Sequence, residues 1–108
     1  MTTHKELDLR SLALHQCVVD KVRNDVALLD KARSTLRRWH QTASPRTFGY
    51  LDAWQRLLDQ DVDTCLAAAT EQSEWGDAMR QASPLSCLLT KQERFAFLKN
   101  WKERHASQ

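Results

Sequence analysis

Residues 50–69 read YLDAWQRLLDQDVDTCLAAA, and this stretch decides the fold class. Its first half carries Trp54, Leu57 and Leu58, spaced three and four residues apart as on one face of a helix. The apolar residues after Asp61 continue the same spacing. Asp61 itself is a preferred N-cap residue, and an acid at a helix start also suits the helix dipole. The stretch therefore predicts two consecutive amphipathic helices with a short break between them.

The rest of the chain has the same helical spacing, and no stretch alternates apolar and polar residues as a half-buried strand would. Two glycines and two prolines are too few for the many tight turns of a β-sandwich or barrel. We therefore predict an all-α fold, a compact single-domain bundle of five to six short helices over residues 1–108, which is an ordinary length for one domain. The expected helices cover Leu7–Arg23, Val26–Gln41, Thr47–Asp59, 62–70, Glu74–Ala82 and 90–105.

The expected helix over residues 90–105 has the clearest start signal. Residues 90–93 read TKQE, which fits the capping box of a Ser or Thr followed three residues later by Glu. Phe95, Leu98 and Trp101 then lie close to one face of this helix. We expect these side chains to help fill the core.

The connector over residues 80–89 reads RQASPLSCLL and is apolar for a loop. Loops normally run over the protein surface. Either this connector tucks Leu85, Leu88 and Leu89 into the core, which is the interpretation we favour, or it presents an apolar patch to a partner.

Membrane insertion and secretion are not indicated. No apolar run is long enough to cross a bilayer, and the first residues contain no apolar segment of the signal-peptide type. Cys17, Cys65 and Cys87 are an odd and widely spaced set, which is atypical of a disulfide framework. Reduced thiols are typical of the cytoplasm, so we expect a cytoplasmic protein.

No group of residues predicts catalysis. His15 and Cys17 are two residues apart and so point to different sides of a helix; we interpret the cysteines as small buried thiols rather than nucleophiles. Cysteine and histidine do not recur at zinc-ligand spacing. Asp59, Asp61 and Asp63 fit a helix start better than an acid–base pair. We expect no enzymatic activity, no metal and no cofactor.

Charge is unevenly distributed, although the net formal charge is only +2. Residues 31–46 carry five basic side chains and no acid, whereas residues 47–79 carry seven acids and one base, Arg56. Residues 80–108 carry six basic and two acidic side chains. The basic and acidic segments either form ion pairs with each other within the protein, or they present basic and acidic faces to different partners.

Five segments together resemble a known group of proteins. They are LHQ at residues 14–16, LLDKAR at 28–33 with Leu36 and Trp39, YLDAWQRLL at 50–58, RQASPL at 80–85 and LTKQER at 89–94. With these segments the chain resembles small bacterial helical proteins of toxin–antitoxin-like or defence-associated gene pairs. It departs from their pattern at Leu85, where an aromatic residue is expected, and at Ser86-Cys87, where a small Ala-Gly pair is expected. The resemblance implies a bacterial cytoplasmic protein that binds a partner, and it assigns no role to any single residue.

The first functional hypothesis is a non-enzymatic protein-interaction module, antitoxin-like or regulatory, that binds and restrains a partner protein. The acidic segment would face a basic surface of that partner, since opposite charges steer association. Trp54 and Trp75 are the expected anchors because tryptophan is enriched in interface hot spots, and Arg80 is expected at the rim. Whether the chain also forms a homo-oligomer stays open.

The alternative hypothesis is a nucleic-acid-binding transcriptional regulator. It would use the basic side chains of the expected helices over 26–41 and 90–105, because clustered Arg and Lys neutralise phosphates. This alternative requires both helices to share one face. The candidate residues are Arg33, Arg37, Arg38, Lys99 and Lys102.

Overall fold

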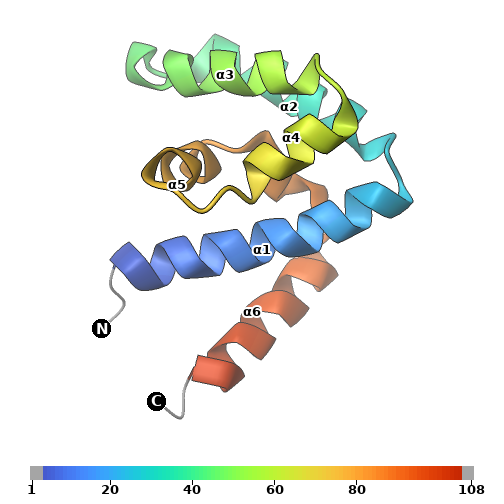
Figure 1. Ribbon diagram of the computed structural model, residues 1–108, viewed down its shortest axis with the longest axis vertical. Helices are drawn as coiled ribbons and strands as arrows, with labels where there is room; N and C mark the ends of the chain where they lie inside the picture. Colours follow the sequence, from blue (N-terminus) through green and yellow to red (C-terminus); the bar gives the residue numbers. More distant parts are fainter. Residues whose placement is uncertain (1–3, 106–108) are drawn as a thin grey trace.

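The computed structural model describes residues 4–105, which form six α-helices and two short 3-10 helices and contain no strand (Figure 1). The elements are α1 (His4–Asn24), α2 (Leu28–Thr42), η1 (Pro45–Thr47), α3 (Phe48–Leu58), α4 (Val62–Ala69), α5 (Glu74–Gln81), η2 (Pro84–Leu88) and α6 (Lys91–His105). The all-α fold predicted from the sequence is confirmed, and the expected helix boundaries differ from these by at most three residues.

The long helix α1 crosses the middle of the molecule (Figure 1). Helices α2 and α3 pack together on one side of it, α4 and α5 lie between them and α1, and α6 leaves on the other side. The core lies where α1, α2, α3, α4 and η2 meet. Its completely or almost completely buried side chains include Val18, Leu36, Leu51, Trp54, Leu58, Leu66 and Leu85.

Three helix starts form as their sequence signals predict. The Asp61 side chain accepts a hydrogen bond from the Thr64 backbone N–H at 3.0 Å and begins α4. Ser73 does the same for the Gly76 N–H at 3.0 Å and begins α5. Both hydrogen bonds of the capping box before α6 are present. The Glu93 N–H donates to Thr90 Oγ1 at 3.1 Å, and the Thr90 N–H donates to Glu93 Oε1 at 2.8 Å. Each such cap contributes about 1 kcal/mol.

The connector over residues 80–89 places its leucines in the core, as the favoured interpretation predicted, and does not present them to a partner. Leu85 is fully buried and Leu88 is 5% exposed within η2, which packs against α1 and α2. Ser83 starts this turn by accepting a hydrogen bond from the Leu85 N–H at 3.1 Å. The connector is therefore a structural part of the bundle.

Helix α6 does not fill the core, so the expectation for its aromatic face is wrong. None of its residues is buried, and Phe95 is 71% exposed. The physical reason is that the side chains of η2 already occupy the space against α1 and α2. At its first turn α6 is tied to the body through Glu93, which pairs with Lys21 at 2.5 Å, and through Arg94, which donates to the Ser86 carbonyl.

The two glycines give a direct test of the packing around α5. A Cβ on Gly76 would lie 2.1 Å from the Glu71 carbonyl oxygen, whereas a Cβ on Gly49 in α3 would meet nothing within 4 Å. We expect Gly76→Ala to lower the free energy of unfolding by about 1–3 kcal/mol, as overpacking does. Gly49→Ala is expected to raise it, by up to about 1 kcal/mol, because alanine is the better helix former. Urea denaturation of both variants checks this, and a Gly76→Ala variant as stable as Gly49→Ala would contradict it.

Candidate partner-binding surface

Arg80, expected at the rim of an interface, is buried inside the domain. Its side chain is 1% exposed and pairs with Asp77, with Nη2 at 2.7 Å from Oδ1. Its Nη1 donates to the backbone carbonyls of Glu71 at 2.8 Å and Ala69 at 3.2 Å, at the C-terminal end of α4. The predicted contact of Arg80 with a partner is therefore wrong. The sequence missed it because the carbonyl acceptors come from the turn between two helices and have no sequence signature.

Trp54 is likewise an internal residue. Its side chain is completely buried, and its indole Nε1–H donates to the Met79 carbonyl at 2.8 Å, which links α3 to α5. A completely buried tryptophan cannot anchor a partner, so this prediction is also wrong. The indole instead satisfies its polar group inside the core, as buried tryptophans usually do.

Trp75 is the one predicted anchor that lies on the surface of the described structure. It is 54% exposed and packs against Tyr50 of α3 in a tilted arrangement, with ring centroids 5.6 Å apart and ring planes at 36°. Its indole forms one wall of a groove of about 280 Å³ between α3, α4 and α5. We call this depression the α3–α5 groove. It is lined by Ala53, Arg56, Leu57, Gln60, Ala68, Glu71, Trp75 and Met79.

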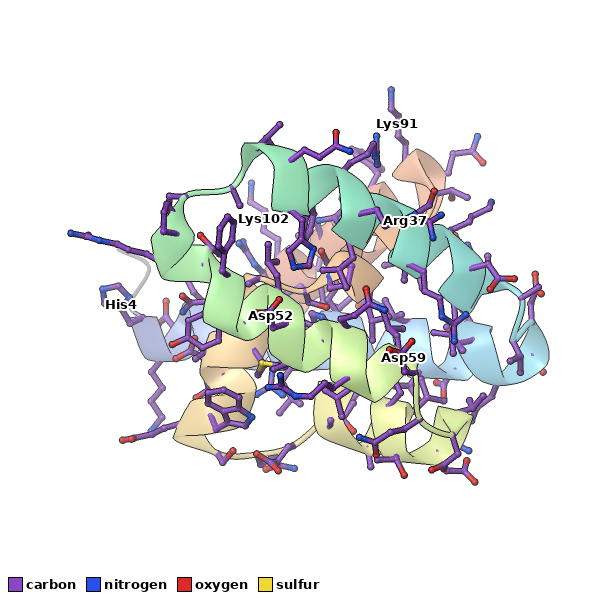
Figure 2. All side chains as sticks on the ribbon, turned by 90° about the horizontal axis from the view of Figure 1, so that it is seen from above. His4, Arg37, Asp52, Asp59, Lys91 and Lys102 are labelled. Carbon is purple, nitrogen blue, oxygen red and sulfur yellow. The ribbon has the colours of Figure 1, made fainter. Side chains whose placement is uncertain are left out.

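One acid, Glu71, and one base, Arg56, line the α3–α5 groove, and further acids lie elsewhere on the segment that forms it. Six of the seven acids in residues 47–79 are exposed, and Arg56 is the single base of that segment. Figure 2, which looks onto α3, shows Asp52 on this helix and Asp59 at its end. The hydrogen bonds from Thr64 lower the pKa of the Asp61 carboxyl, so this acid stays ionised at neutral pH. The groove thus combines a largely apolar lining with one charge of each sign.

The predicted nucleic-acid-binding residues lie on two separate helices, α2 and α6. The Arg33 side chain makes contacts within the domain. Its guanidinium donates hydrogen bonds to the Asp30 carboxylate at 2.7 Å and to the Leu58 carbonyl at 2.6 Å. Arg37 and Arg38 are exposed on α2, and Lys99 and Lys102 are exposed on α6. Helix α2 lies near one end of the molecule's longest axis, and α6 runs toward the other end (Figure 1). The exposed basic residues of α2 and those of α6 are therefore separated along the longest axis of the molecule.

The cysteines differ in their surroundings. Cys65 is buried, and burial raises the pKa of its thiol to about 11. Cys17 and Cys87 are exposed, so the expectation of buried thiols is wrong for these two. Partial burial, followed by the charge of Asp20, raises the pKa of the Cys17 thiol. A raised pKa is the opposite of what activates a cysteine nucleophile.

Within residues 4–105 no group of three or more His, Cys, Asp or Glu side chains is placed to hold a metal ion. No helix among these residues is both long and apolar enough to cross a membrane. Comparison with protein-family models, curated proteins and solved structures gives no match to this chain. The resemblance to helical proteins of toxin–antitoxin-like gene pairs therefore stays a hypothesis.

His15 is a buried titratable group next to the core. Its Nδ1–H donates to the Ser11 carbonyl at 2.8 Å, and its Nε2 is buried with no hydrogen-bond partner among the described residues. Burial, with the nearby charges of Arg80 and Arg94, lowers the pKa of this imidazole from 6.5 to about 4. A proton on Nε2 would be an unpaired charge in the interior, so folding favours the neutral ring.

We expect acid to destabilise the fold through His15. The unfolded chain binds the proton below about pH 6.5 while the folded chain does not, so stability falls as pH drops from 6.5 to 4. The pKa shift of His15 corresponds to a loss of roughly 3 kcal/mol in the free energy of unfolding. Urea denaturation between pH 7 and 4 checks it, with His15→Leu as the comparison. The variant should lose less stability than the wild type over this range, and equal losses would refute the assignment.

Proposed function

We propose that the chain is a non-enzymatic protein-interaction module, antitoxin-like or regulatory, that binds a basic surface of a partner protein through the α3–α5 groove. The observation that carries this proposal is the position of Trp75, more than half exposed beside an apolar groove and packed against Tyr50. Tryptophans in such positions dominate the binding energy of many interfaces. A bacterial, cytoplasmic setting, which the resemblance implies, belongs to the same proposal.

The rigidity of the groove supports this role. Trp75 lies on α5, and α5 is joined to α4 through Arg80 and to α3 through the bond from the Trp54 indole to the Met79 carbonyl. A preformed surface loses little conformational entropy when a partner binds. Glu71 lines the groove and can pair with a basic residue of a partner, although Arg56 of the same lining offsets its charge. A partner segment with an apolar side chain between basic residues has the complementary chemistry.

The nucleic-acid alternative has less support. Arg33 is bonded within the fold, and the exposed basic residues of α2 and α6 lie far apart (Figure 1). Binding by either helix alone would involve few phosphate contacts, and affinity for nucleic acid grows with their number.

Affinity capture from host lysate, treated with nuclease, tests the proposal. We expect a protein partner that is retained by the wild type and lost by Trp75→Ala, with binding weakened by roughly 30-fold or more as for hot-spot tryptophans. Moderate salt should also weaken the complex, because exposed charges are screened.

Phe95→Ala is the matched control, since it removes an even more exposed aromatic side chain from α6. This variant should keep the partner. Equal binding by wild type and Trp75→Ala would contradict the proposed site, and recovery of nucleic acid alone would favour the alternative hypothesis.

A further inference from the structure

Helix α6 has an outer side that the rest of the domain leaves uncovered. It lies beyond α1 at the edge of the molecule (Figure 1), and none of its residues is buried. Phe97 and Trp101 line a pocket against α1, so they mark the side of α6 that faces the body. Phe95, which is 71% exposed, lies on the opposite side, and Leu98, which is 37% exposed, lies one turn along from it. Apolar side chains exposed together on one element mark an interaction surface.

Three lysines surround Phe95 on this side of the helix. Lys91, Lys99 and Lys102 are exposed, and each is four or seven residues away from Phe95, which places them on its side of α6. None of the three forms an ion pair within residues 4–105. Figure 2 shows the Lys91 side chain extending away from the molecule. We call these three lysines, with Phe95 and Leu98, the α6 outer face.

The acidic side chains of α6 lie outside the outer face. Glu93 is turned toward the body, where it pairs with Lys21 at 2.5 Å. Glu103 follows Lys99 by four residues and lies at the edge of the face. The outer face therefore carries only positive charge around its two apolar side chains. Its complement is a negatively charged surface that also accepts apolar groups.

A bilayer that contains anionic phospholipids has both properties. Lysine is a compact point charge that suits a layer of lipid headgroups, whereas recognition of single phosphates or carboxylates favours the planar fork of arginine. No arginine belongs to the outer face, because Arg94 donates to the Ser86 carbonyl and Arg104 lines the pocket against α1. Leu98 has no ring to stack on a nucleic-acid base, but it gains from contact with acyl chains. Lysine stems also extend along apolar surface while their ammonium groups stay in water.

We propose that the α6 outer face binds peripherally to membranes that contain anionic phospholipids. Phe95 and Leu98 enter the boundary between headgroups and acyl chains, and the three lysines contact the headgroups. The helix lies in the plane of the interface and does not cross the bilayer. Attachment through two apolar side chains and three lysines is weak and reversible. The α3–α5 groove belongs to other helices, so this inference does not rest on the proposed function.

Co-sedimentation of the full chain with vesicles tests the proposal. Vesicles of phosphatidylcholine and phosphatidylserine should bind the wild type, and high salt should release it, whereas vesicles of phosphatidylcholine alone should bind little. Phe95→Ala, Leu98→Ala and Lys99→Glu should each weaken binding to the anionic vesicles about fivefold or more. Glu103→Lys adds a base at the edge of the face and should strengthen binding by a similar factor.

Matched variants on other helices are the controls. Leu9→Ala removes a leucine of α1 that is 48% exposed, and Lys31→Glu makes the same charge change at an exposed lysine of α2. Both should bind the anionic vesicles nearly as well as the wild type. Circular dichroism checks that every variant folds, which is expected because the changed side chains are exposed.

Three results would overturn the proposal. The first is a wild type that does not bind anionic vesicles or that binds phosphatidylcholine vesicles equally well. The second is an equal loss of binding in Lys31→Glu and Lys99→Glu, which would mean that net charge alone attracts the chain. The third is a chain that binds a single-stranded oligonucleotide through Phe95 but does not bind anionic vesicles, which would assign the outer face to nucleic acid.

Discussion

The buried guanidinium of Arg80 is the interaction on which the surface of this protein depends. A helix leaves its last carbonyl groups without partners, and α4 ends at the buried Ala69. Arg80 reaches back from α5 to bond the carbonyls of Ala69 and Glu71, while Asp77 balances its charge. This geometry requires the Glu71 carbonyl to approach α5 closely, and Gly76 permits it because it has no Cβ. One glycine and one arginine thereby fix the angle between two short helices.

The exposed groove follows from that internal arrangement. Gly76, Met79 and Arg80 of α5 are buried, and the Met79 carbonyl accepts the Trp54 indole bond. Trp75, on the outer side of the same helix, packs against Tyr50. Helices of eight residues are too short to be stable alone. The position of the surface residues on α4 and α5 therefore depends on the buried contacts of Arg80 and Trp54.

The sequence predicts the helices well because their signals are local. The caps at Asp61 and Ser73 and the capping box at residues 90–93 each involve residues three apart, and all three form. The sequence fails where the outcome depends on packing between distant segments. Helical spacing groups Trp54 with its neighbours on one face but does not exclude a partner contact, and it gives no sign that Arg80 meets two carbonyls. The helical spacing of residues 90–105 also predicts wrongly that α6 fills the core, because η2 occupies the space against α1 and α2.

Replacing Arg80 by methionine, which is similar in length but has no hydrogen-bond donor, tests the central role of this residue most directly. We predict that Arg80→Met lowers the free energy of unfolding by about 3 kcal/mol or more, because two interior carbonyls and a partly buried carboxylate lose their partner. The matched change at the exposed Arg37 should alter stability by no more than about 0.5 kcal/mol. Equal stability of the two variants in urea denaturation would contradict the account, since it would mean that Arg80 does not hold α4 and α5 together.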